Sequence, residues 1–423
     1  MRIIWLKLDV IMMLDDDLTK VKNASKKLMR LNSNQKNSCL NNIKNALLNN
    51  INLIIEKNKI DVNNAINNKL SESMIERLTL DENKIKIICK GIDDLIKLDD
   101  VVGEVIETIN KDNGLIIEKV RVPFGVIAVI FESRPNVCVD IACLCIKTSN
   151  ACVLKGGSEA INTNEFLVSL MKNAISDIID SNVIYFISNS SREITNELLT
   201  KREYIDLMIP RGGKNLIKYV VDNSKIPYIE TGAGNCHLYV HSDADLDMAL
   251  NIAINAKYQR PSVCNSIENI IVDEAICHKF LPMLKDKFDE LKIEIRADEK
   301  ASKIINCKLA TEDDFYTEYN DYIVSIKVVK NIDEAINHIN THSTKHSEAI
   351  ITRNIDAYTK FLNEIDSACV YHNASTRFTD GGEFGFGAEI GISTGKLHAR
   401  GPMGLKEICS YKYKIYGNGS VRK

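Results

Sequence analysis

A cysteine in a polar turn is the residue best placed to do chemistry. Cys264 lies in Arg-Pro-Ser-Val-Cys-Asn, residues 260–265, just after an apolar helical run. The other cysteines fall inside predicted strands and helices, where a thiol packs as a small hydrophobic group. A thiol in a turn that follows a proline can be exposed, deprotonated and nucleophilic. We therefore predict that Cys264 is a catalytic nucleophile, the alternative being one more structural thiol.

Two glycine pairs stand between a predicted strand and a predicted helix. Lys155 leads into Gly156-Gly157-Ser158-Glu159, and Arg211 leads into Gly212-Gly213. Backbone amides at a helix N-terminus, beside a cation, suit phosphate groups or ribose hydroxyls. The Gly-x-Gly-x-x-Gly fingerprint of an ordinary dinucleotide fold is missing from these turns. The glycines therefore either bind a nucleotide or only turn the chain.

Two further stretches carry side chains that could bind a ligand. His338, His342 and His346 are four residues apart, as one face of a helix presents them to zinc, but the helix is predicted to end before His346, so we expect no metal site. Residues 373–394 form a long glycine-rich loop, which in a compact domain is usually functional. It leads into Lys396-Leu-His-Ala-Arg400, a cluster of cationic donors for an anionic substrate.

The periodicity of apolar residues predicts the elements that position these groups. Residues 18–100 have helical spacing. From residue 122, buried strands alternate with helices of 10 to 15 residues, and a second alternating block covers residues 268–373. This pattern predicts βαβ units with parallel sheets, in two lobes with ligands in the cleft between them.

Two stretches outside the lobes alternate like exposed strands. They are residues 103–122, where Asp112-Asn113-Gly114 predicts a hairpin turn, and residues 410–422. Because such short strands are marginal alone, we expect them to pair with another subunit, in a homo-oligomer.

Composition excludes several classes of protein. The length of 423 residues, 45% of them hydrophobic, predicts two or three packed units. A net charge of −3, with both signs interleaved, offers no basic stripe for nucleic acid. No apolar run approaches the roughly 18 residues of a membrane helix. The twelve cysteines include no Cys-x-x-Cys pair, which favours a reducing cytoplasm.

Five motifs together resemble the γ-glutamyl phosphate reductases, a family of the aldehyde dehydrogenase superfamily. They are residues 122–137, 154–160, 209–217, 255–268 and 373–405. The resemblance implies the α/β fold of that superfamily, with a cofactor lobe that lacks the glycine fingerprint, a catalytic lobe, and a strand arm for oligomerisation.

The domain boundaries follow from this resemblance. Residues 1–107 and 124–229 are expected to form the cofactor-binding domain with its helical N-terminal part, and residues 230–408 the catalytic domain. Residues 108–123 and 409–423 are expected to be the oligomerisation strands.

The resemblance also implies a reaction. It is the NADPH-dependent reduction of L-glutamate 5-phosphate to L-glutamate 5-semialdehyde, with release of phosphate, in L-proline biosynthesis. Cys264 would expel phosphate from the acyl phosphate and hold a thioester that accepts hydride. A separate glutamate 5-kinase is then a possible partner. Hydrolytic or CoA-acylating aldehyde dehydrogenases, which use the same thiol, and a non-catalytic cofactor-binding oligomer are the alternatives.

Roles for further residues are implied by the same resemblance. The Asn136 side-chain amide would bind the oxyanion. The positions implied for the cofactor are Lys155 and Ser158 for the adenosine ribose or its 2′-phosphate, Gly212 and Gly213 for the pyrophosphate, and Glu318 for the nicotinamide ribose. Anionic substrate groups call for cationic donors, and the candidates are Arg260, Arg377, His398 and Arg400.

Glu230 is a candidate for a different role, that of a general base. Glu230 lies 34 residues before Cys264, a spacing similar to that of the general base in hydrolytic aldehyde dehydrogenases. A base that activates water would destroy the thioester before hydride arrives. We therefore predict that Glu230 is not an essential base.

Overall fold

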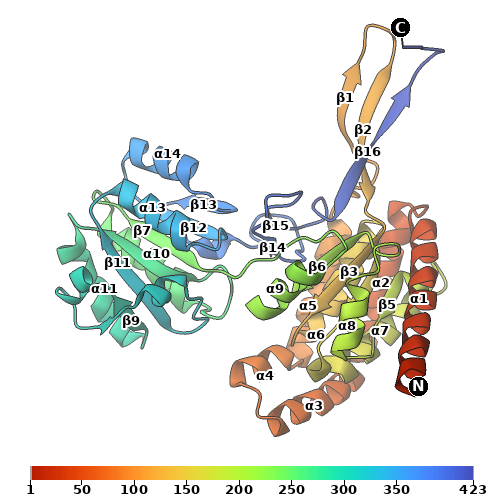
Figure 1. Cartoon of the computed structure of the whole chain (residues 1–423), viewed down its shortest axis with the longest axis horizontal. Helices are drawn as coiled ribbons and strands as arrows, with labels where there is room; N and C mark the ends of the chain where they lie inside the picture. Colours follow the sequence, from red (N-terminus) through yellow and green to blue (C-terminus); the bar gives the residue numbers. More distant parts are fainter. Residues whose placement is uncertain (1, 423) are drawn as a thin grey trace. The chain divides into compact units, whose positions relative to one another are not determined.

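The computed structural model of the protein describes residues 2–422, in two compact units. Unit 1 comprises Met1–Glu230, Gly385–Gly391 and Met403–Lys423, and unit 2 comprises Thr231–Phe384 and Ile392–Pro402. Figure 1 labels their elements. Within residues 2–422, no helix is both long enough and apolar enough to cross a bilayer.

Unit 1 begins with the helices that the spacing over residues 18–100 predicts. They are α1 (Arg2–Leu28), α2 (Ser33–Asn49), α3 (Ile51–Asn67), α4 (Glu72–Leu78) and α5 (Glu82–Lys97). α5 shows why they form, because its apolar residues recur on one face and are buried there, whereas the other face is charged. That face packs on α2 and on α6.

A parallel sheet forms the centre of unit 1, in the strand order β5-β4-β3-β6. Its strands are β3 (Val126–Phe131), β4 (Ala151–Lys155), β5 (Ile184–Phe186) and β6 (Leu207–Arg211). The segments between and after them are α6 (Pro135–Lys147), η1 (Ser158–Ala160), α7 (Ile161–Ile175), η2 (Ser181–Val183), α8 (Arg192–Leu198) and α9 (Lys214–Asn223). The predicted alternation of strands and helices is confirmed. Because α1 and α6 both pack on β4, every residue of that strand is buried.

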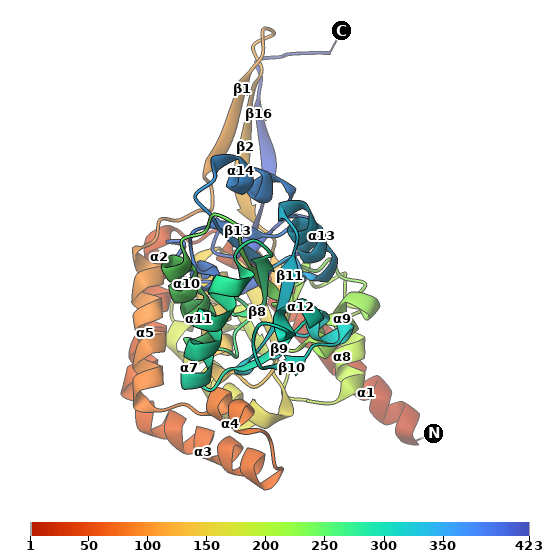
Figure 2. The ribbon, with the colours of Figure 1, turned by 90° about the vertical axis from the view of Figure 1, so that its left-hand side faces the viewer.

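A separate antiparallel sheet extends away from the helices of unit 1 (Figure 1 and Figure 2). It consists of β1 (Val105–Asn110), β2 (Ile116–Pro123) and β16 (Cys409–Tyr416), in the order β1-β2-β16. The predicted hairpin at Asp112-Asn113-Gly114 is confirmed, with Gly114 at a φ of +84°. These stretches pair with each other, since β16 pairs with β2 of the same chain over its whole length, and the expected pairing with another subunit stays a prediction.

Unit 2 is built on a sheet of seven parallel strands, in the order β10-β9-β11-β8-β7-β12-β13. The strands are β7 (Cys236–Val240), β8 (Ile267–Asp273), β9 (Glu294–Ala297), β10 (Lys308–Leu309), β11 (Ile323–Val329), β12 (Ser347–Ile351) and β13 (Cys369–His372). The helices are α10 (Leu246–Tyr258), α11 (Cys277–Glu290), α12 (Glu299–Ser302), α13 (Ile332–His342) and α14 (Ile355–Glu364). The short elements are η3 (Glu312–Tyr316), η4 (Thr376–Phe378), β14 (Ile392–Ser393) and β15 (Gly401–Pro402).

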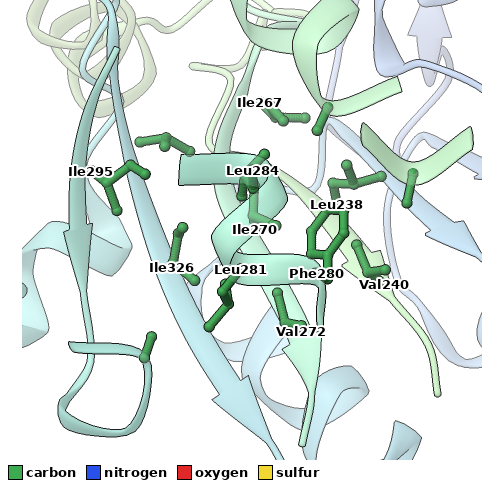
Figure 3. Close-up of a cluster of buried hydrophobic side chains, with 14 of the residues drawn as sticks. Leu238, Val240, Ile267, Ile270, Val272, Phe280, Leu281, Leu284, Ile295 and Ile326 are labelled. Atoms are coloured by element: carbon green, nitrogen blue, oxygen red, sulfur yellow. The ribbon is translucent and has the colours of Figure 1, made fainter. Parts of the chain in front are cut away.

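Both faces of the unit 2 sheet are buried. Leu238 and Val240 of β7 join one hydrophobic cluster with α10 and α11, whereas Tyr239 between them joins a second cluster with α13 and α14. Figure 3 shows Phe280 and Leu284 of α11 in the first cluster. Alternate side chains of a strand point to opposite faces, so helices on both faces explain the nearly continuous apolar runs in the sequence.

The structure bears on two expectations, that His346 lies outside a helix and that the cysteines other than Cys264 are buried. The helix α13 ends at His342, which confirms that His346 lies outside it. Among the cysteines, Cys307 is an exception to the prediction of burial, because it lies half-buried in the loop before β10.

The N-terminus of α7 is capped from another helix. Asp61 of α3 is buried, and its carboxylate accepts hydrogen bonds from the backbone N–H groups of Asn162 (3.3 Å) and Thr163 (2.8 Å). It also accepts from the Asn162 side-chain amide (2.8 Å) and the Thr163 hydroxyl (2.6 Å). The first N–H groups of a helix lack intrahelical acceptors and favour an anion. Asp61 therefore fixes α3 to the start of α7.

Replacement of Asp61 by alanine should lower the free energy of unfolding by about 2–3 kcal/mol, because buried donors lose a charged acceptor. The corresponding fall in melting temperature is roughly 4–12 °C, measured by differential scanning calorimetry. Glu56→Ala, at an exposed position of the same helix, is the control. A fall no larger than that of the control would contradict the capping role.

Candidate functional site

The loop of Cys264, between α10 and β8 of unit 2, is held against the segment that enters β7. Cys264 is half-buried. A Cβ added at Gly234 would lie 1.5 Å from the Cys264 carbonyl oxygen, so only glycine allows the two backbones to approach this closely. The same carbonyl accepts a hydrogen bond from the buried Cys236 thiol, with 3.1 Å between Sγ and O. Sequence reasoning missed Gly234, although a glycine beside a strand is typical of close backbone approach.

The residue after the thiol joins this loop to the glycine-rich stretch. The Asn265 side-chain amide donates to the carbonyl oxygens of Thr379 (2.9 Å) and Arg377 (3.3 Å). In return, the Thr376 hydroxyl donates to the Asn265 carbonyl at 2.7 Å. The part of the predicted functional loop that contains η4 is thus fixed beside Cys264.

One of the four predicted cationic residues, Arg377, is close enough to Cys264 to interact with it, and Arg260 is close enough to interact with Arg377. Arg377 donates from Nε to Gln259 Oε1 at 3.0 Å. Burial lowers the pKa of Arg377, and the positive charge of Arg260 acts in the same direction, whereas Cys264 opposes it. Neighbouring positive charge favours the thiolate over the thiol and can bind an anion.

Another candidate, Arg400, lies beside a different carboxylate of unit 2, that of Asp366. Asp366 accepts from Lys396 (2.7 Å), Lys345 (3.0 Å) and Arg400 (2.9 Å). The hydrogen bond from Lys396, with those from Lys345 and Arg400, holds the pKa of Asp366 well below its usual range. His398 is exposed, at a φ of +71°. Arg260 and Arg377 therefore form one group, whereas Arg400 belongs to another, around Asp366.

Glu318 contacts the backbone behind the nucleophile. Its Oε1 accepts the N–H of Gly234 at 2.7 Å. A fully buried ion pair, Lys257 to Glu268 at 2.6 Å, joins the end of α10 to the start of β8. Burial opposes ionisation of both partners, since it raises the pKa of Glu268 and lowers that of Lys257. The sequence analysis did not predict this pair, which holds the two ends of the Cys264 loop together.

In unit 1, the residues expected to bind the cofactor ribose lie at the end of β4. Lys155 is buried, and burial lowers its pKa against the opposing effect of Glu159. No residue in the described part of the chain accepts a hydrogen bond from the Lys155 ammonium group. Beside it, both polar atoms of the Asn164 side chain are buried without partners, and a Cβ on Gly156 would lie 2.5 Å from Asn164 Nδ2. Ser158 is exposed at the start of η1. These unpaired polar groups fit the hydroxyl or phosphate oxygens of a nucleotide.

Two carboxylates connect the loops that follow β3, β4 and β6. Glu159 accepts from the Ser133 backbone N–H (2.6 Å) and hydroxyl (2.9 Å), which holds Ser133 at a φ of +45°. Glu132 accepts the N–H of Gly213 at 2.8 Å, at the N-terminus of α9. A Cβ at Gly212 would lie 2.3 Å from the same carboxylate. The α9 terminus thus already holds an anion, so pyrophosphate binding at Gly213 requires Glu132 to move.

Asn136, the residue implied for the oxyanion, is the second residue of α6, after Pro135. Its side-chain Nδ2 donates to Asp140 Oδ2, one helical turn further on, at 3.0 Å. Asn136 is half-buried. A side-chain amide at the start of a helix can donate to negative charge that develops nearby.

Comparison with known proteins identifies close relatives. The model of the aldehyde dehydrogenase family matches residues 15–308 and 317–413. The γ-glutamyl phosphate reductase of Caldicellulosiruptor bescii is 52% identical over 410 residues, 96% of this chain and 98% of that protein. The crystal structure of γ-glutamyl phosphate reductase from Thermotoga maritima is 45% identical, with a TM-score of 0.95 over 97% of this chain and 100% of that one. An acetylating aldehyde dehydrogenase from Geobacillus thermoglucosidasius, 17% identical over 99% of each chain with a TM-score of 0.70, shares the fold.

The substitution Gly234→Ala should slow the reaction of Cys264 with iodoacetamide by about 10- to 100-fold, because the added methyl group must displace the Cys264 backbone. The rate is measured by mass spectrometry of the Cys264 peptide. Gly395→Ala is the control, since its Cβ would meet only Ser393 Oγ, at 3.6 Å. Equal alkylation rates in the two variants would show that this close approach does not position the thiol.

Proposed function

The chain belongs to the γ-glutamyl phosphate reductases of the aldehyde dehydrogenase family, and we infer that it reduces L-glutamate 5-phosphate to L-glutamate 5-semialdehyde with NADPH, releasing phosphate, in L-proline biosynthesis. The observation that carries this function is the 52% identity over 96% of the chain. The half-buried Cys264, which interacts with the guanidinium group of Arg377, supports it.

We propose that Cys264 is the nucleophile. Its thiolate attacks the acyl carbon, the bond from that carbon to the phosphate oxygen breaks, and inorganic phosphate leaves with the electron pair. The product is a thioester on Cys264. Because the acyl phosphate is already activated, the residues around it need to hold the thiolate and donate to the oxyanion, and a strong acid is not needed. The Asn136 side-chain amide and the backbone N–H of Cys264 are the proposed oxyanion donors.

We propose that different cationic residues bind the phosphate and the α-carboxylate of the substrate. The phosphate is bonded to the carbon that Cys264 attacks, so Arg377, which interacts with that thiol, and Arg260, which interacts with Arg377, suit the phosphate. His398 and Arg400 then remain for the α-carboxylate. The ion pair between Arg400 and Asp366 would have to open for this role.

NADPH, when bound, supplies the hydride. Lys155 and Ser158 are the proposed contacts of the adenosine ribose or its 2′-phosphate, and the unpaired Lys155 ammonium group supports this role. Gly212 and Gly213 are proposed for the pyrophosphate, and Glu318 for the nicotinamide ribose. Through its bond to Gly234, Glu318 would also link cofactor binding to the backbone behind Cys264.

The strand arm supports a homo-oligomer. β1 and β16 are the edge strands of their sheet, and their exposed side chains include Ile109, Tyr413 and Ile415. Open edges with exposed apolar residues favour pairing with another chain. A second copy of this protein is the proposed occupant, and a glutamate 5-kinase, which makes the labile acyl phosphate, is the proposed second partner.

The state of the cysteines supports a cytoplasmic location. Within residues 2–422, none of the twelve forms a disulfide bond, and the proposed nucleophile works only as a thiolate. A reducing compartment keeps such thiols unpaired.

In the reverse reaction, the protein should form NADPH from glutamate semialdehyde and NADP⁺ only when inorganic phosphate is present, because phosphate must release the thioester. Cys264→Ala should abolish this turnover, measured by NADPH absorbance. Glu230→Gln is the matched variant and should retain phosphate-dependent turnover. Turnover that is indifferent to phosphate, or lost in Glu230→Gln with NADPH binding intact, would indicate a hydrolytic dehydrogenase.

Arg377→Ala should raise the KM for phosphate in the same reaction by about 10- to 100-fold, the effect of losing a charged hydrogen bond of about 1.5–3 kcal/mol. The KM for semialdehyde should change less. Arg400→Ala is the matched arginine variant, expected to show the opposite pattern. If Arg400→Ala raises the KM for phosphate and Arg377→Ala does not, the two assignments must be exchanged.

A further inference from the structure

The side-chain amide of Asn136 has a partner that determines its orientation. Asn136 and Asp140 are four residues apart in α6 and therefore lie on the same face of the helix. Nδ2 of Asn136 donates to Oδ2 of Asp140 at 3.0 Å. No other hydrogen bond of the Asn136 side chain is formed within residues 2–422, so its second Nδ2 hydrogen is left for a ligand.

An oxyanion donor of this type needs such a partner. The χ2 torsion of asparagine is broad and roughly two-fold, so an unrestrained amide presents its oxygen about as readily as its nitrogen. A carboxylate accepts hydrogen bonds and donates none. It therefore accepts from the amide nitrogen of Asn136 and disfavours the flipped form, in which two oxygens would face each other.

The charge state of Asp140 suits this role. Desolvation raises the pKa of its carboxyl to about 6, against the lowering effects of the Asn136 hydrogen bond and of Arg211 on β6. With a pKa of about 6, the ionised form, which can only accept hydrogen bonds, predominates at neutral pH. On its own helix, burial raises the pKa of the Cys138 and Cys143 thiols, and the charge of Asp140 acts in the same direction.

The helix that carries both residues is firmly placed. The residues of α6 between them and beyond are buried, among them Val137, Ile141 and Leu144, and α6 packs on β4, α5 and α7. At its start, Ser133 is fixed by two hydrogen bonds to Glu159. The positions of the Asn136 and Asp140 backbones are thus set by the core of unit 1, and only the amide orientation is left to the hydrogen bond.

We propose that Asp140 is a positioning residue that holds the Asn136 amide with its nitrogen toward the developing oxyanion. This inference rests on the oxyanion role proposed for Asn136. Asp140 does not touch the substrate in this proposal and acts only through Asn136.

A double-mutant cycle on the full-length protein tests the proposal, with kcat of the phosphate-dependent reaction as the readout. Asn136→Ala should reduce kcat by about 100- to 1000-fold, as removal of an oxyanion donor does. Asp140→Ala should reduce it by about 10- to 100-fold through misorientation of the amide. In the Asn136→Ala background, Asp140→Ala should have almost no further effect, because the group it orients is gone. If the loss of kcat in the double variant equals the product of the two single losses, the proposal is overturned.

Further variants distinguish an effect on the orientation of the Asn136 amide from an effect on folding. Asp140→Asn keeps the shape and one acceptor oxygen, so it should retain more activity than Asp140→Ala at a similar melting temperature and NADPH affinity. Glu165→Ala, at an exposed position on α7, is the control for loss of a helical carboxylate and should match the wild type. Equal losses in Asp140→Asn and Asp140→Ala, paralleled by a fall in melting temperature, would assign Asp140 a purely structural role.

The same experiment distinguishes two failures. If Asn136→Ala keeps the wild-type kcat, the oxyanion role of Asn136 is wrong. If Asn136→Ala is strongly impaired but Asp140→Ala is not, the role of Asn136 stands and the inference about Asp140 fails.

Discussion

Backbone N–H groups that leave the sheet ladders must find other acceptors, and the functional loops depend on this requirement. At several strand and helix ends the acceptor is a carboxylate from far along the chain. The pairs are Asp61 with Asn162 and Thr163, Glu132 with Gly213, Glu159 with Ser133, Asp206 with Val126, and Glu318 with Gly234. Each bond connects two segments that the sheet alone would leave independent. The loops that carry the candidate site are thereby fixed before any ligand binds.

The nucleophile benefits most from this arrangement. Cys264 is in a loop rather than in a strand or helix, yet its backbone contacts Gly234, its neighbour Asn265 bonds to the η4 segment, and the Lys257–Glu268 pair joins the two ends of its loop. A reactive group held in this way loses little freedom when the substrate arrives. This arrangement buries the charged side chains of Lys257 and Glu268, and their burial is tolerated because the two form an ion pair.

Local patterns in the sequence were sufficient for the elements and for the prediction that Cys264 is the nucleophile. Periods of 2 and 3.6 residues depend only on which face of a strand or helix is buried, so the helical front, the alternating blocks and the hairpin at residues 112–114 could be predicted. Cys264 stood out because its turn is polar, unlike the segments around the buried cysteines. The motifs that resemble the reductases identified the reaction.

Only the tertiary structure decided which groups meet. It paired β16 with β2 and brought Asp61 of α3 to the N-terminus of α7. It separated Arg260 and Arg377 from Arg400, which bonds Asp366. A charged residue looks the same in the sequence whether its partner is solvent, a ligand or a distant backbone amide. The sequence by itself determined the elements and led to the proposal of a reactive thiol at Cys264, because both depend on neighbours along the chain. The bonds that orient the site join residues many positions apart, and they form only once the sheets and helices have packed.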